Sequence, residues 1–147
     1  MRVSVQSAPF DFGTEAQRFA EGHSTMGAIV TFTGVVRDTG EDALVAMEIE
    51  HYPGMTEAAL TKIAQEASER WSLGDVLVIH RHGRLVSGEM IMMVATAARH
   101  RKDAFEAAEY LMDYLKSRAP FWKREVTAQG AEWVAARDED EDALSRW

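Results

Sequence analysis

The chain has no cysteine among its 147 residues. This absence excludes disulfide bonds, a cysteine nucleophile and a persulfide carried by the chain itself. A lack of cysteine is typical of proteins from a reducing compartment. We therefore expect a cytoplasmic protein.

Long apolar segments are also missing. The longest nearly apolar run, Met90–Ala98, is far shorter than the roughly 20 residues of a membrane-spanning helix. The N-terminal sequence MRVSVQSAPFDFG lacks the apolar segment of a secretory signal peptide. We therefore expect no membrane partner.

Basic residues are outnumbered, with 16 Lys and Arg against 24 Asp and Glu and a net charge of −8. This balance argues against nucleic acid as the main partner. The charge is uneven, however, because residues 99–124 contain seven Lys and Arg but only four acidic residues. A local positive field in an acidic protein suits a small anionic ligand. The alternative is a solvated helix face of mixed charge.

The length and the 46% apolar content suit a single domain over residues 1–147. Hydrophobic patterns predict strands at 2–6, 27–37, 43–51, 76–82, 89–97, 121–126 and 133–136, with a turn region at 83–88. They predict helices at 14–21, 56–71 and 103–118. Because strands and helices are interspersed without strict βαβ alternation, we predict an α+β fold with a mostly antiparallel sheet and packed helices.

Several residues are predicted to set the ends of these elements. Asp11 or Thr14 would cap the first helix, and Thr56 the second. Gly34, inside a strand rich in β-branched residues, indicates a bulge or a close approach of another backbone. Residues 138–147 begin with an acidic run and predict a C-terminal tail that is mobile or stabilised by a partner.

The segment 110–125, YLMDYLKSRAPFWKRE, places a helix directly before a strand. Pro120 ends the helix because proline cannot donate a backbone hydrogen bond and disfavours helical geometry in the residue before it. Lys116 then lies in the last helical turn and Lys123 on the strand that follows. A tight corner can bring both lysines onto one pocket wall. The alternative is that cations near a helix C-terminus only complement the helix dipole.

Other polar groups offer weaker signals. Arg37 ends a strand beside a loop, where it could bind an anion or be an ordinary surface residue. Residues 99–102, RHRK, precede a helix and either bind a phosphate or form a basic surface turn. His80 and His82 share a strand face, but no third ligand has suitable spacing, so we predict no metal. A phosphate-binding loop and a serine nucleophile motif are absent.

Four segments of the chain match one known family together. They are FTGVVR at 32–37, EHYPGMT at 50–56, HR at 100–101 and YLKSRAPFWKRE at 114–125. In combination, and in register from about residue 27 to residue 133, they resemble the large, catalytic subunit of molybdopterin synthase. EHYPGMT and the K-x-R-A-P-F-W-K segment are the most specific parts of this resemblance.

The resemblance implies an α/β-hammerhead fold, consistent with the α+β class. It implies a sulfurtransferase of molybdenum cofactor biosynthesis that converts cyclic pyranopterin monophosphate (precursor Z) into molybdopterin. Two dithiolene sulfurs would come from the C-terminal Gly-Gly thiocarboxylate of a small, ubiquitin-like carrier subunit, which threads into a pocket. The implied assembly is a heterotetramer around a homodimer of large subunits. No cofactor of the chain's own is expected.

By position, the resemblance implies that Lys116 and Lys123 are the essential catalytic residues. The implied substrate-binding residues are Val35, Val36, Arg37, His100, Arg101, Lys116, Lys123, Arg124 and Glu125. Arg37, His100 and Arg101 would hold the phosphate and the pterin, and the neighbouring protomer can supply one of these three. The lysines would neutralise the thiocarboxylate and act as acid and base groups.

Two positions make it less direct to assign the family's residue roles to this chain. Many relatives have a small residue where this chain has Arg99, so the extra charge either shifts ligand contacts or lies at the surface. The loop 38–42 is short and acidic, which leaves its role over the site open.

Two other classes of function remain, namely a non-catalytic module for an extended peptide or a phosphorylated molecule, and a homodimeric scaffold. Binding without turnover would indicate the first of these.

Overall fold

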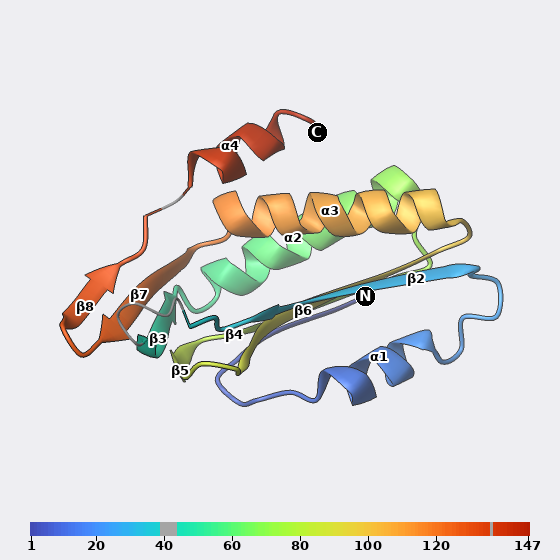
Figure 1. The fold of residues 1–147 in the computed structure, drawn as a ribbon. Coiled ribbons are helices and arrows are strands. Elements are labelled where there is room, and N and C mark those ends of the chain that lie inside the picture. The colour runs from blue at the N-terminus through green and yellow to red at the C-terminus, as the bar shows by residue number, and fades with distance from the viewer. Residues whose placement is uncertain (39–43, 136) are drawn as a thin grey trace.

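The computed structural model describes residues 1–38, 44–135 and 137–147. In this part of the chain, two four-stranded sheets are combined with four helices (Figure 1). The strands are β1 (Arg2–Gln6), β2 (Ala28–Val35), β3 (Leu44–His51), β4 (Asp75–Arg81), β5 (Gly83–Leu85), β6 (Met90–Ala98), β7 (Phe121–Thr127) and β8 (Gly130–Trp133). The helices are α1 (Phe12–Ala20), α2 (Met55–Trp71), α3 (Arg101–Ser117) and α4 (Asp138–Leu144). The predicted α+β class is confirmed, because the strand pairs among these residues are antiparallel except for β1 with β4.

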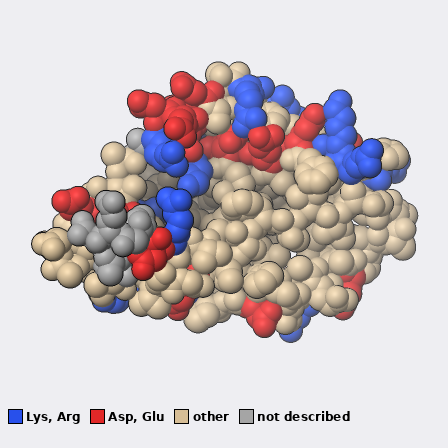
Figure 2. All heavy atoms as spheres, viewed as in Figure 1, with Lys and Arg blue, Asp and Glu red and all other residues tan. Residues whose placement is uncertain are grey.

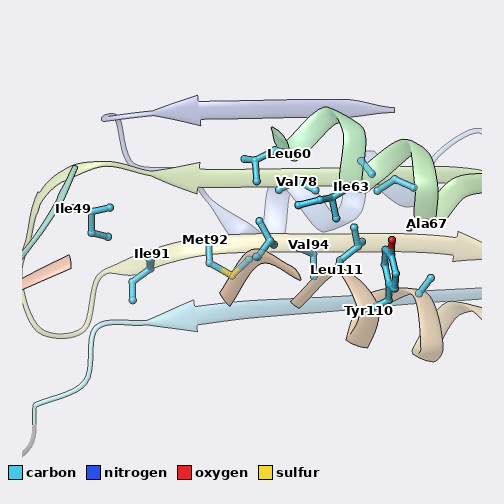
Figure 3. Packing of buried hydrophobic residues seen from close by; sticks show 14 of the residues in the cluster. Ile49, Leu60, Ile63, Ala67, Val78, Ile91, Met92, Val94, Tyr110 and Leu111 are labelled. Carbon is cyan, nitrogen blue, oxygen red and sulfur yellow. The ribbon is translucent and has the colours of Figure 1, made fainter. Parts of the chain in front are cut away.

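The first sheet, ordered β1-β4-β6-β2, has α2 and α3 on one face and α1 on the other (Figure 1). Its central strands β4 and β6 are buried along almost their whole length, as expected for strands covered on both faces. The main core lies between this sheet and the pair α2 and α3, where Leu60, Val94 and Leu111 are fully buried (Figure 3). Burying one such side chain contributes about 1.5–3 kcal/mol. A smaller cluster around Phe19 packs α1 onto the opposite face.

The second sheet, ordered β5-β3-β7-β8, lies at the end of the molecule where α2 begins and α3 ends (Figure 1). Its central pair, β3 and β7, sets Ile49 opposite Lys123. The sequence predicted only a turn at 83–88, whereas residues 83–85 form β5 on the outer edge of β3. Three residues are too few to show a periodic pattern, and the pairing with β3 makes this segment a strand. No helix within the described residues is long and apolar enough to cross a membrane.

The observed ends of the elements follow from individual residues. Asp11 caps α1, and its side chain accepts a hydrogen bond from the backbone N–H of Thr14. The register shift between Gly34 and Val35 is the predicted irregularity in β2. The prediction that Thr56 caps α2 is wrong, because Gly54 occupies the cap with a positive φ of 84° that favours glycine.

The chain beyond β7 differs most from the sequence prediction. The last strand is 130–133 instead of 133–136, and residue 136 lies outside the described residues. Where the sequence predicted a tail and no helix, residues 138–144 form helix α4, which packs on α3 of the same chain (Figure 1). Trp147 holds this arrangement, because its ring packs edge-on against Trp71 and Tyr110 and its indole N–H donates to Asp113. These partners are distant in sequence, so the local acidic pattern did not reveal them.

Candidate active site

A sharp corner joins α3 to β7. The helix ends where the backbone N–H of Arg118 donates to the carbonyl of Tyr114 at 2.7 Å. Pro120 follows, and the N–H of Phe121 donates back to the carbonyl of Ala119 at 2.8 Å. The chain therefore turns within a few residues from the last helical turn into the strand, as the proline predicted.

This corner encloses a cavity of about 150 Å³, which we name the lysine pocket. Its lining residues are His80, Leu115, Lys116, Ala119, Phe121, Lys123, Val134, Ala135, Arg137 and Asp140. The structure thus brings Lys116 and Lys123 to one cavity, as the sequence predicted, although their chemical roles stay predictions. Figure 2 shows Lys and Arg atoms gathered around a hollow below the acidic residues of α4.

The two lysines have different surroundings. Lys116 is exposed, whereas Lys123 is partly buried. Burial lowers the pKa of Lys123, the positive charge of Lys116 lowers it further, and Asp140 acts in the opposite direction. No ion pair joins Lys123 to a carboxylate in the described part of the chain. The neutral amine of Lys123 therefore forms at lower pH than that of a fully solvated lysine, which favours a role as an acid or base.

His80 contributes a buried imidazole to the same pocket. Its ring stacks on Phe121 with centroids 3.7 Å apart, and its Nδ1 lies 2.7 Å from the carbonyl oxygen of Arg81. Burial lowers the pKa of His80 to about 3, and the nearby charge of Lys123 also lowers it. His80 is therefore neutral at neutral pH.

The expected pairing of His80 and His82 on one strand face is not what the structure shows. β4 ends at Arg81, and the His82 ring lies 4.2 Å from that of His51. Among the described residues, no group of three His, Asp or Glu side chains could hold a metal ion. His80 belongs to the lysine pocket, which sequence spacing alone did not indicate.

The C-terminal segment covers the lysine pocket. Arg137 and Asp140 line the cavity, and Glu141 forms an ion pair with Arg118 at 2.8 Å. Sequence reasoning missed these residues, because an acidic run is most often a solvated face. Only the packing of α4 on α3 brings them to the lysines.

Arg124 and Glu125 adjoin the lysine pocket without being among its described lining residues. Arg124 forms an ion pair with Glu48 on β3, and its guanidinium lies 5.4 Å from the ring centroid of Trp133. Glu125 lies between Met47 of β3 and a residue of β8 in the sheet. In this structure both side chains belong to the second sheet, and their role in binding a substrate stays a prediction.

The remaining predicted residues lie elsewhere. Val35 is exposed at the end of β2, and Val36 is buried, with its N–H donating to the carbonyl of Glu89 at 2.9 Å. Arg37 is exposed just before residues 39–43, which lie outside the described residues. None of the three is among the described residues that line the lysine pocket.

His100 and Arg101 lie at the opposite end of α3 from Lys116. His100 is the N-cap of the helix, and with Arg99 it lines a second cavity of about 380 Å³ beside Trp71. With a rise of 1.5 Å per residue, Arg101 and Lys116 are about 22 Å apart along the helix. One chain therefore does not bring His100 and Arg101 to the predicted catalytic lysines.

Comparisons with known proteins place this geometry in a family. Residues 5–118 match the family model described as MoaE protein. The chain is 70% identical over 147 residues to the molybdopterin synthase catalytic subunit of Cereibacter sphaeroides, covering 100% of both. It is 50% identical over 147 residues to the protein of the same name from Escherichia coli (strain K12), covering 99% of this chain and 97% of that one.

Solved structures agree with these relatives. The molybdopterin biosynthesis MoaE protein from Burkholderia ambifaria aligns with a TM-score of 0.84 at 50% identity, covering 99% of this chain and 96% of that chain. Molybdopterin synthase from Staphylococcus aureus aligns with a TM-score of 0.82 at 31% identity, covering 90% and 96%. The chain therefore belongs to the MoaE family, the catalytic subunits of molybdopterin synthase in molybdenum cofactor biosynthesis.

Proposed function

We propose that this chain transfers sulfur to cyclic pyranopterin monophosphate, forming the dithiolene of molybdopterin. The sulfur donor is the C-terminal thiocarboxylate of a small ubiquitin-like carrier subunit. The observation that carries the proposal is the convergence of Lys116 and Lys123 on one cavity at the corner between α3 and β7. Family membership supports the reaction class, and the absence of cysteine agrees with sulfur delivered by another chain.

The pocket suits the anionic end of a peptide. An exposed ammonium group at Lys116 attracts the thiocarboxylate, and the shallow apolar walls formed by Leu115 and Ala119 exclude part of the surrounding water. Electrostatic attraction is stronger in such a partly desolvated place than in bulk water. The carrier tail would enter with its sulfur toward the lysines.

Lys123 supplies the proton transfer. Each cycle forms one carbon–sulfur bond on the pterin side chain and breaks one carbon–oxygen bond there, with the oxygen leaving as water or as the freed oxygen of the opened cyclic phosphate. Water then cleaves the bond between the carrier acyl carbon and sulfur. The carrier leaves as a carboxylate. Because burial and the positive charge of Lys116 lower the pKa of Lys123, its amine gives up and takes back a proton more readily than that of a fully solvated lysine.

His100 and Arg101 can join the lysines in one site only if they come from a second copy of the chain. His100 and Arg101 lie about 22 Å along α3 from Lys116, which is too far to share one small substrate. If both groups act on the same molecule, the two ends of α3 must come from different protomers. This supports the homodimer inside a heterotetramer and makes each active site a composite of two chains.

The reaction is tested by mixing the chain with thiocarboxylated carrier and precursor Z and measuring dithiolene formation. Product is expected only when all three components are present. Failure of the wild-type chain to form product with a competent carrier would contradict the proposal. Binding of the carrier tail without turnover would favour a non-catalytic module instead.

The composite site is tested with mixed dimers of Lys116→Ala and Arg101→Ala chains. The assay uses precursor Z at a concentration well below its KM, where both homodimeric variants are slow. In the mixed dimer one site carries both substitutions and the other carries neither, so about half of the wild-type activity per dimer is expected. Each homodimeric variant alone supplies the control. If the two residues acted within one chain, the mixed dimer would be no more active than the variants.

A further inference from the structure

The EHYPGMT segment at residues 50–56 has no task in the proposed reaction, and none of its residues is among the described residues that line the lysine pocket. It runs from the end of β3 into the first turn of α2. Its last residue, Thr56, does not cap α2, yet its side chain is fully buried. A buried hydroxyl lowers stability unless it has hydrogen-bond partners, and valine would fill the same space without one. The question is therefore what the hydroxyl binds.

The hydroxyl of Thr56 joins two segments that are far apart in the sequence. Its oxygen accepts a hydrogen bond from the backbone N–H of Tyr52 at 3.1 Å, and the hydroxyl donates to the carbonyl oxygen of Pro120 at 3.4 Å. A hydroxyl can donate once and accept as well, so both bonds form together. The backbone N–H of Thr56 donates in turn to the carbonyl of Tyr52 at 2.9 Å. Residues 52–56, which we name the motif turn, are thus closed by a reciprocal pair of hydrogen bonds that leaves the hydroxyl proton for Pro120.

Pro120 is the residue at which α3 turns into β7. Two further contacts attach the motif turn to the first residues of that strand. β3, which leads into the turn, pairs with β7 as far as Phe121. The ring of Tyr52 packs edge-on against the ring of Trp122, with centroids 4.8 Å apart. The hydroxyl of Thr56 adds a contact just before the strand begins, so the motif turn holds the corner on both sides of its bend.

We propose that Thr56 is a positioning residue that, through the carbonyl of Pro120, holds the corner between α3 and β7 and with it the two lysines of the pocket. Lys116 precedes this proline and Lys123 follows it in the same corner, so a shift of the proline changes the path that joins them. The effect on turnover rests on the proposed function. A displacement of about 1 Å in a catalytic group can lower a rate by about 10²-fold.

Two substitutions separate the hydroxyl of Thr56 from its methyl group. Thr56→Val keeps the shape and loses both hydrogen bonds of the hydroxyl, whereas Thr56→Ser keeps the hydroxyl and loses the methyl group. Thr96→Val is the matched control. Thr96 is also fully buried, and its hydroxyl donates to the carbonyl of Ala104 at 2.8 Å, near the other end of α3. This control removes a buried hydroxyl without touching the corner.

The first readout is backbone hydrogen exchange, measured residue by residue by NMR on the full chain. The N–H of Tyr52 loses its acceptor in Thr56→Val and should exchange faster. The N–H of Phe121 donates to the carbonyl of Ala119 within the corner. It should exchange about tenfold faster in Thr56→Val, because the corner opens locally. Thr56→Ser and Thr96→Val should keep both N–H groups close to their wild-type rates.

The second readout is turnover with thiocarboxylated carrier and precursor Z. Thr56→Val should lower kcat about 10–100-fold with a KM for precursor Z close to wild type, because the lysines move and the exposed residues at the other end of α3 do not. Thr56→Ser should recover most of the rate, and Thr96→Val should keep kcat. The reverse order, with Thr56→Ser slow and Thr56→Val normal, would show that Thr56 only fills space. Equal loss in Thr56→Val and Thr96→Val would also overturn the proposal.

A third readout uses the wild-type chain and does not depend on any variant folding. A hydroxyl proton that is buried and hydrogen-bonded exchanges slowly with water, so in protein labelled with ¹³C-threonine the hydroxyl of Thr56 should give its own proton resonance. A hydroxyl proton averaged with water would contradict the bond to Pro120.

These readouts keep the role of Thr56 separate from the reaction itself. If the wild-type chain forms no product with a competent carrier, the proposed function fails, while exchange at Phe121 still decides whether Thr56 holds the corner. An unchanged exchange rate at Phe121 in Thr56→Val would overturn the role of Thr56 even in a fully active enzyme.

Discussion

The two ends of α3 both carry positive charge, but in very different surroundings. At the C-terminal end, Lys123 is partly buried beside Lys116 and the neutral His80, and its pKa is lowered. At the N-terminal end, His100 and Arg101 are exposed to solvent. An arginine keeps its charge at every accessible pH, whereas a partly buried lysine can exchange its proton. This difference agrees with the proposed function, in which one end performs chemistry and the other end binds an anion.

The largest effect should come from removing a lysine at the C-terminal end. Lys123→Ala and Lys116→Ala should each lower kcat by about 10²–10⁴-fold, because general acid–base catalysis accelerates a reaction by a factor of this size. Lys123→Arg is the matched control, since it keeps the charge but cannot give up its proton. We expect it to remain slow in single-turnover assays. A near-normal rate in either alanine variant with a native circular dichroism spectrum would remove that residue from the mechanism.

The next largest effect is expected at the N-terminal end of α3, where a substitution should weaken the binding of precursor Z. Arg101→Ala should raise the KM for precursor Z about 10–100-fold with little change in kcat, since a charge-assisted hydrogen bond is worth about 1.5–3 kcal/mol. Higher salt should raise the wild-type KM more than that of the variant, because exposed charges are screened. Lys102→Ala is the control for general charge. A fall in kcat with an unchanged KM would contradict the assignment of substrate binding to the N-terminal end of α3.

A smaller effect should follow from loosening the cover over the lysine pocket. Trp147→Ala removes the packing on Trp71 and Tyr110 and should lower the free energy of unfolding by about 1–3 kcal/mol. The loss of this packing should also move the pH midpoint of amine labelling at Lys123, measured by peptide mass spectrometry, toward the midpoint of an exposed lysine. Arg118→Ala, which breaks an exposed ion pair with Glu141 and a hydrogen bond to the carbonyl of Ser117, should cost less than about 1 kcal/mol. Equal effects of the two variants would show that α4 is not anchored through Trp147.

The smallest effect concerns stability against pH. Burial lowers the pKa of Lys123, so between that lowered value and the ordinary value of 10.5 the unfolded chain binds more protons than the native chain. The stability of the wild type should therefore rise with pH across this window. Lys123→Met should be the more stable protein at neutral pH, and the difference should shrink as the pH approaches 10.5. Urea unfolding at several pH values measures it, and parallel curves would contradict the lowered pKa.

Much of the fold could be predicted because its signals are local. Apolar periodicity located α2 and α3, Asp11 marked the start of α1, and Gly34 marked the irregularity in β2. The failures were of a different kind. β5 is a strand only because β3 lies beside it, and α4 is a docked helix only because Trp147 finds an aromatic surface on α2 and α3. Such partners lie far away in the sequence, where no local pattern shows them.

The candidate site divides in the same way. The sequence by itself determined that a helix ends before Pro120 and that lysines stand on both sides of the corner, because a proline acts on its own neighbours. Only the tertiary structure decided what surrounds them. It set His80 beneath Phe121, brought Asp140 over the cavity, and placed His100 at the far end of α3. Burial and pKa depend on which distant groups pack together, and that is decided when the sheets and helices assemble.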